Sequence, residues 1–171
     1  RVVSLDQAVC ELLAGELQSN TVCRTFDDGY RDNVQYALPV LKKYGVPGHV
    51  FLATNFIDSP DPLWHDRVLE AFREASIDSI SYAPAEIKQT SMNNIDQRAA
   101  VAFRLLPWLM QFTPEERDDH IREIVRICKP SEGDYQRLML SRSELHELQQ
   151  GGVTFGAHTC SHPILSTLTQ A

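Results

Sequence analysis

Hydrophobic positions in the first third of the chain predict a strand, a helix and a second strand. Residues 21–26 form a short β-prone run, and residues 49–54 form a nearly continuous apolar run. Between them, residues 34–44 carry an apolar stripe with helical spacing. A strand, a helix and a strand in close succession indicate a βαβ unit and therefore a parallel sheet. Pro39 lies inside the stripe, so we expect the helix to kink or restart there.

Sequence signals for helix ends mark further helices. Ser4, Thr113 and Ser141 each stand three residues before a Glu or Gln, which is the pattern of a capping box. Pro107 is expected to disturb one of the helices. Residues 77–94 have a mixed pattern that assigns them to neither helix nor strand. The predicted helices span residues 5–13, 64–75, 95–112, 114–128 and 142–150.

The alternation of strands and helices is interrupted between residues 59 and 140 and returns with a third strand at residues 153–157. We therefore predict an α/β fold with a helical insertion, residues 59–140, between the second and third strands. A length of 171 residues suits a single domain with a hydrophobic core of its own, spanning residues 1–171.

Candidate catalytic side chains follow two of the predicted strands directly. Asp27 and Asp28 follow the first strand, and His158 and His162 follow the third. In β/α folds the carboxyl ends of the strands form the edge where active sites are built. One carboxylate and two imidazoles, with a position left for water, make the ligand set of a catalytic zinc site. The second carboxylate is then free to act as a base toward that water.

Each motif also has a simpler interpretation. An Asp-Asp-Gly triplet is common in solvated turns, although adjacent carboxylates repel each other unless a cation or a proton intervenes. His158 and His162 lie either on one face of a helix or in a turn, and either arrangement brings two imidazoles to one ion. Cys160 lies between them and is expected to point away and pack. Tyr30 and Arg31 either line a cleft or belong to a surface turn.

The remaining histidines carry less chemical information. His49 begins the second strand, at the opposite edge from the candidate site, and is expected to be structural. His65 lies beside an aromatic residue and is expected to pack. His120 and His146 fall on polar helix faces, where we expect them to be solvated.

Composition excludes several classes of function. The net charge of −7 argues against nonspecific nucleic-acid binding, and no apolar run is long enough for a transmembrane helix. The four cysteines are scattered, which favours buried free thiols over a disulfide framework. No signal peptide is visible at the start of the chain, which favours a cytoplasmic location.

Two motifs resemble those of the polysaccharide deacetylases, the NodB-homology group of carbohydrate esterases. Thr25-Phe26-Asp27-Asp28-Gly29 resembles their first motif, and His158-Thr159-Cys160-Ser161-His162-Pro163 resembles their second. The similarity extends over residues 36–52 and 152–165. The region between the motifs looks like the helical insertion of members associated with bacterial surface-polysaccharide synthesis.

The resemblance implies a distorted (β/α) barrel with fewer than eight strands and the metal-dependent removal of N- or O-acetyl groups from a polysaccharide or glycan precursor. The substrate partner would be an acetylated carbohydrate. Asp27 would be the general base, and Asp28, His158 and His162 would hold the metal. The metal would be Zn²⁺, with Co²⁺ or Ni²⁺ as alternatives. Thr159 would brace the ligand loop through its hydroxyl.

Later motifs of this family supply an arginine that orients the base and a histidine that protonates the leaving group. The sequence ends at Ala171, soon after the second motif. We therefore expect the N-terminal part of a deacetylase domain, with an incomplete barrel. The alternative is a catalytically incomplete metal- or carbohydrate-binding module. A third hypothesis gives the helical insertion a role in protein interaction.

Overall fold

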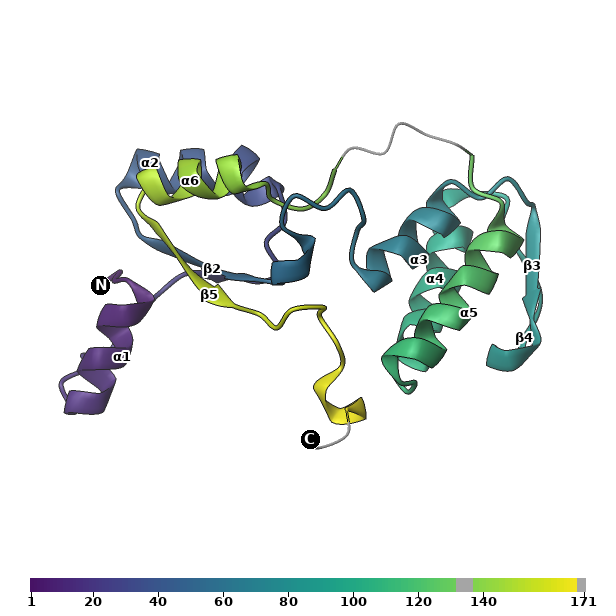
Figure 1. Ribbon diagram of the computed structural model, residues 1–171, viewed down its shortest axis with the longest axis horizontal. Helices are drawn as coiled ribbons and strands as arrows, with labels where there is room; N and C mark the ends of the chain where they lie inside the picture. Colours follow the sequence, from purple (N-terminus) through teal and green to yellow (C-terminus); the bar gives the residue numbers. More distant parts are fainter. Residues whose placement is uncertain (132–136, 169–171) are drawn as a thin grey trace. The chain divides into compact units, whose positions relative to one another are not determined.

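The computed structural model describes residues 1–131 and 137–168 and divides the chain into two compact units (Figure 1). The first unit consists of Arg1–Pro62 and Gln136–His162, and the second of Leu63–Tyr135 and Pro163–Ala171. Both candidate motifs lie in the first unit, except for the final proline of the second motif. The single domain with an insertion at residues 59–140 stays a prediction, and residues 132–136 of that insertion lie outside the described residues.

A three-stranded parallel sheet organises the first unit. Its strands are β1 (Thr25–Phe26), β2 (Gly48–Leu52) and β5 (Val153–Ala157), in the spatial order β1-β2-β5. The parallel sheet predicted from the βαβ pattern is confirmed. β1 is shorter than predicted, because Val22 exchanges backbone hydrogen bonds with the residues around Val2 instead of extending the strand.

Two helices pack on one face of this sheet (Figure 1). They are α2 (Leu38–Tyr44) and α6 (Arg142–Gln150). The predicted restart at Pro39 is confirmed: a π-helical turn at Asn33–Ala37 precedes α2, and the proline falls in the first turn of α2, where a missing N–H costs no hydrogen bond. The core between helices and sheet includes Leu38, Leu41, Val50, Leu148 and Val153.

Helix α1 (Leu5–Ala14) begins where its sequence signal predicted. The Ser4 side chain accepts a hydrogen bond from the backbone N–H of Gln7, and Gly15 closes the helix in the left-handed conformation. None of the helix residues is buried, and Leu12 and Leu13 are exposed.

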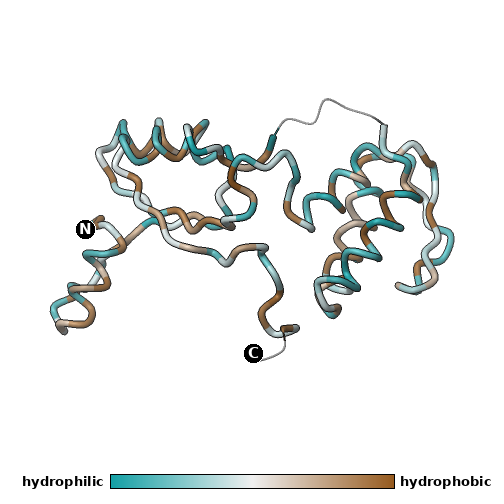
Figure 2. Tube along the Cα trace, in the orientation of Figure 1, coloured by the Kyte–Doolittle hydropathy of each residue, from teal (hydrophilic) through white to brown (hydrophobic). Residues whose placement is uncertain are grey.

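The second unit has a core of its own. Helices α3 (Trp64–Arg73), α4 (Ile95–Leu109) and α5 (Pro114–Cys128) surround it, and hydrophobic residues recur along all three (Figure 2). An antiparallel hairpin of β3 (Ser79–Tyr82) and β4 (Ile87–Ser91) completes the unit, in the stretch that the sequence pattern left unassigned. Short 3-10 turns lie at Thr54–Phe56, Ala83–Ala85 and Leu165–Thr167.

Pro107 disturbs α4 less than predicted. It lacks the N–H that would bond to the carbonyl four residues earlier, yet the helix continues past it for two residues and ends at Leu109 rather than at Phe112.

The prediction that His120 is solvated is wrong. Its ring lies against Trp108 and Phe112, and its Nδ1 is 2.7 Å from the hydroxyl oxygen of Tyr82. The polar pattern of α5 suggested an exposed position, but an aromatic cluster from three elements covers this ring. His146, in contrast, is exposed as predicted.

The cysteines are free, as predicted, but they are not all buried. Cys128 is buried, Cys23 is intermediate, and Cys10 and Cys160 are exposed. Cys160 therefore does not pack as expected, because the loop that carries it lies at the surface.

Within the described residues, no helix is both long enough and apolar enough to cross a membrane. This agrees with the absence of a long apolar run in the sequence.

Glu144 links the loop after β1 to the start of α6. Its carboxylate accepts hydrogen bonds from Nε of Arg31 (2.7 Å), from a terminal nitrogen of Arg137 (2.9 Å), and from the N–H and hydroxyl of Ser141 (2.8 and 3.0 Å). Burial raises the pKa of the Glu144 carboxyl, but these hydrogen bonds outweigh burial and lower the pKa from 4.5 to about 2.

We expect the stabilisation from Glu144 to depend on pH. Because its folded-state pKa is depressed, the contribution is complete above pH 4.5 and is lost as the pH falls toward about 2. Urea denaturation of the wild type and of Glu144→Gln should show a difference in unfolding free energy that shrinks between about pH 5 and about pH 3. A difference that stays constant over this range would contradict the assignment.

Two glycines with the same backbone conformation give a matched test of the turn after β1. Gly29 (φ +87°) and Gly152 (φ +85°) are both left-handed, but a Cβ on Gly29 would lie 2.8 Å from Cδ2 of Leu52, whereas a Cβ on Gly152 would meet nothing within 4 Å. Gly152→Ala should lower the unfolding free energy by about 1–2 kcal/mol. Gly29→Ala should cost a further ~1–3 kcal/mol from overpacking. Equal losses of unfolding free energy for the two variants in urea denaturation would show that the Leu52 side chain moves aside at no cost.

Candidate metal centre

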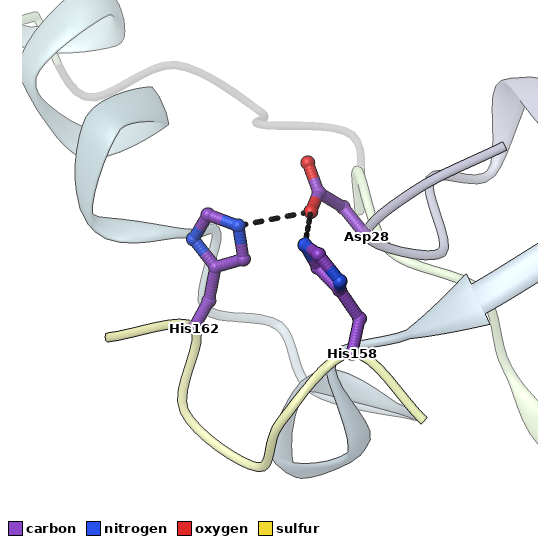
Figure 3. Close-up of side chains that lie close together, drawn as sticks. All are labelled: Asp28, His158 and His162. Carbon is purple, nitrogen blue, oxygen red and sulfur yellow. Dashed lines mark ion pairs between the residues drawn. The ribbon is translucent and has the colours of Figure 1, made fainter. Parts of the chain in front are cut away.

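The structure brings Asp28, His158 and His162 together beyond the carboxyl ends of β1 and β5 (Figure 3). Nε2 of His162 lies 3.0 Å from Oδ1 of Asp28, and Nε2 of His158 lies 3.4 Å from the same oxygen. Both imidazoles therefore point at one carboxylate oxygen. Within residues 1–131 and 137–168, this is the only group of three or more acidic, histidine or cysteine side chains close enough to share a metal ion.

The end of β2 and the segment after it hold both motif loops through backbone hydrogen bonds. On one side, the Ala53 N–H donates to the Asp28 carbonyl (3.1 Å). On the other, the His158 N–H donates to the Leu52 carbonyl (2.8 Å), and the Thr54 N–H donates to the Thr159 carbonyl (3.2 Å). The central strand of the sheet therefore fixes the separation of the two loops.

The backbone at the site is strained. Asp28 (φ +71°), Thr159 (φ +64°) and His162 (φ +52°) all adopt the left-handed conformation. Such residues cost on the order of 1–3 kcal/mol each and gather at functional sites. Of the two arrangements considered for His158 and His162, the structure has the turn and not the helix. The Thr159 hydroxyl accepts a hydrogen bond from the His162 N–H (3.0 Å) and braces this turn, as the resemblance implied.

The three side chains fit a divalent metal. Oδ1 of Asp28 is buried and accepts no hydrogen bond from the described residues. Burying this oxygen is costly unless a positive group, such as a metal ion, approaches it. Ligand atoms around a tetrahedral zinc ion with bonds of about 2.1 Å are about 3.4 Å apart. The Asp28–His162 and Asp28–His158 separations of 3.0 and 3.4 Å are close to this value. A carboxylate with two imidazoles is also a donor set that zinc accepts.

Asp27 is not part of this group. It is exposed next to Asp28, and its carbonyl accepts a hydrogen bond from the Gly29 N–H in a tight turn (2.8 Å). The two neighbouring carboxylates thus occupy different environments, one half-buried against the imidazoles and one facing solvent. Arg31, for which a cleft or a surface turn was expected, forms an ion pair with Glu144.

Two other histidines have structural positions. His49 is buried in β2, and its Nδ1 lies 2.8 Å from the hydroxyl of Thr154 on the neighbouring strand, so its predicted structural role is confirmed. His65 packs edge-on against Trp64, which also agrees with prediction.

Some residues that support the site carry no signal in the sequence. Ala53 and Thr54 act through their backbones, which leaves no signature in residue type. Glu144 was identified only as the third helical residue of a capping box, and nothing in the sequence connects it to Arg31, 113 residues away.

Comparison with known proteins agrees with the two motifs. A family model described as "Polysaccharide deacetylase" matches residues 14–171. The Bacillus subtilis (strain 168) protein named "Putative polysaccharide deacetylase YxkH" is 37% identical over 71 residues, which are 42% of this chain and 24% of that protein. The chain thus matches about a quarter of the length of this curated relative. No solved structure matches the chain. With a family model that covers almost its whole length, the chain belongs to the polysaccharide deacetylase family.

Proposed function

We propose that this protein is a metal-dependent hydrolase that removes N- or O-linked acetyl groups from a polysaccharide or glycan precursor. Membership of the polysaccharide deacetylase family supports deacetylation of a carbohydrate. The observation that carries the metal dependence is the convergence of two imidazoles on the buried carboxylate oxygen of Asp28. We further propose that β1, β2 and β5 are neighbouring strands of a distorted (β/α) barrel.

Asp28, His158 and His162 would hold the metal, most favourably Zn²⁺, with Co²⁺ or Ni²⁺ as alternatives. When bound there, such an ion lowers the pKa of a coordinated water toward about 7 and polarises the acetyl carbonyl. All three side chains are half-buried, and the Thr159 hydroxyl braces the turn that carries the two histidines, which favours the pre-organised geometry that a catalytic centre requires.

Asp27 would act as the general base. Its carboxylate is exposed beside Asp28, so an attacking water can reach it, and it would accept one proton from that water. The water oxygen then bonds to the acetyl carbon, the bond from that carbon to the sugar nitrogen or oxygen breaks, and the leaving group takes up a proton. The products are acetate and the free amine or hydroxyl of the sugar.

Metal binding is expected to depend on the three converging side chains. Asp28→Asn keeps a residue type that tolerates the left-handed backbone but removes the charge, so we expect at least a tenfold loss of Zn²⁺ affinity by competition with a chelating dye. His146→Ala is the matched control, because His146 is an exposed histidine of the first unit whose Nε2 contacts only Gln150 within the described residues. Zinc affinity of Asp28→Asn equal to that of His146→Ala would remove Asp28 from the ligand set.

Replacing the proposed base should reduce catalysis without removing the metal. Asp27→Asn should retain zinc and lose about 10²–10⁴-fold in kcat. Acetate release from an acetylated chito-oligosaccharide and from an acetyl-ester sugar, with and without chelator, is the assay. Asp32→Asn, which changes another exposed carboxylate nearby in the sequence, should remain as active as the wild type. Full activity of Asp27→Asn would assign the base elsewhere, and zinc binding without acetate release by the wild type would favour a metal- or carbohydrate-binding module.

A further inference from the structure

Glu144 lies where two segments that carry the site come together. It is the third residue of the capping box that starts α6, and its side chain is only 14% exposed. Helix α6 leads directly into β5, which ends at His158. A carboxylate removed this far from water needs several donors to offset its lost hydration, and Arg31, Arg137 and Ser141 supply them.

Arg31 ties the same carboxylate to the loop of Asp27 and Asp28. It stands three residues beyond Asp28, and its own N–H donates to the Leu138 carbonyl (2.7 Å). The Leu140 N–H donates to the Gly29 carbonyl (2.9 Å), so residues 29–31 and 138–140 run antiparallel, with a bridge between Tyr30 and Met139. A short piece of backbone pairing therefore joins the carboxylate loop to the chain entering α6.

Arg137 holds the other side of this pairing. One of its terminal nitrogens donates to Glu144 (2.9 Å), and the other donates to the carbonyl of Met139. Glu144 thus accepts from an arginine on each of the two paired segments. Hydrogen bonds between an arginine and a carboxylate are stronger than neutral ones, and they restrict both the distance and the orientation of the two groups.

We propose that Glu144 is a positioning residue that clamps the loop of Asp27 and Asp28 to the base of α6, so that Asp28 meets the imidazoles of His158 and His162. This inference rests on the proposed metal-dependent function. Among the described residues, the hydrogen-bond partners of Glu144 are Arg31, Arg137 and Ser141, not the candidate ligands. Its effect passes through Arg31 on one side and through α6 and β5 on the other.

The capping box of α5 shows what a carboxylate in this helical position does without the clamp. Glu116 caps Thr113 with the same pair of bonds, from the backbone N–H (3.1 Å) and the hydroxyl (2.9 Å). Among the described residues no arginine pairs with Glu116, and it lies in the second unit. Glutamine can also occupy the third helical position of a capping box and accept the same hydrogen bonds. Glu144→Gln and Glu116→Gln therefore both keep a cap, and only the first removes an arginine clamp.

The test compares these two variants in the full chain with two readouts. The first is amide hydrogen exchange at Arg31 and Leu140, relative to His49, whose N–H donates to Arg24 in the β1–β2 ladder. The second is affinity for Co²⁺, followed by the visible absorption of the bound ion. For Glu144→Gln we expect at least tenfold faster exchange at Arg31 and Leu140 than at His49, and about tenfold weaker Co²⁺ binding. Glu116→Gln should match the wild type in both.

A double variant identifies the route of the effect. If Glu144 acts through Arg31, Arg31→Gln combined with Glu144→Gln should weaken Co²⁺ binding no further than either change alone, because contacting residues are not additive. Full additivity would contradict this route.

The outcomes separate this proposal from the proposed function. Wild-type exchange and Co²⁺ affinity in Glu144→Gln overturn the positioning role and leave the metal centre intact. A wild type that binds no Co²⁺, combined with faster exchange at Arg31 and Leu140 in Glu144→Gln, overturns the metal centre and keeps the clamp. Weaker Co²⁺ binding together with faster local exchange supports both.

Discussion

The candidate site depends on the backbone hydrogen bonds that the segment after β2 makes to both motif loops. Because β2 is the central strand, its exit lies between those of β1 and β5. Ala53 binds the Asp28 carbonyl on one side, and Leu52 and Thr54 bind the histidine loop on the other. Side chains from two loops that are distant in sequence therefore converge, because each loop is bonded to the same segment. The register of the sheet sets this spacing, since a slip of one residue would turn every following side chain to the opposite face.

Strain at the site requires support from the rest of the first unit. Three left-handed residues that are not glycine, at on the order of 1–3 kcal/mol each, cost a sizeable part of the stability of a small domain. The threonine is the most costly, because its branched side chain crowds the left-handed backbone. The apolar core under α2 and α6, and the charged hydrogen bonds at Glu144, are the opposing contributions. Such a site persists because its surroundings determine it, and this is the state that a pre-organised catalytic centre needs.

Local signals in the sequence predicted the elements that carry the site, and long-range packing decided what the sequence left open. Capping residues and Pro39 act within a few residues of themselves, so helix starts could be predicted well. Placing both motifs at strand ends required only the βαβ pattern. The β3–β4 hairpin was missed because its mixed pattern stabilises strands only against the core of the second unit. His120 was misjudged because its three aromatic partners come from α4, the segment just after it, and β3. The contact of Glu144 with Arg31 could not be predicted, because the two residues are close only in the folded chain.

Backbone conformation, more than residue type, separates the two adjacent aspartates. Asp27 and Asp28 are chemically identical, and without the family resemblance residue type alone does not say which one would bind a metal. Asp28 adopts the left-handed conformation, and its side chain points at the imidazoles of His158 and His162. Asp27, one residue earlier, faces solvent. The two carboxylates therefore occupy different environments: Asp28 faces two imidazoles, and Asp27 is exposed to solvent. The proposed division into ligand and base therefore agrees with the different orientations of the two carboxylates, in a turn that Gly29 and the hydrogen bond from Ala53 help to hold.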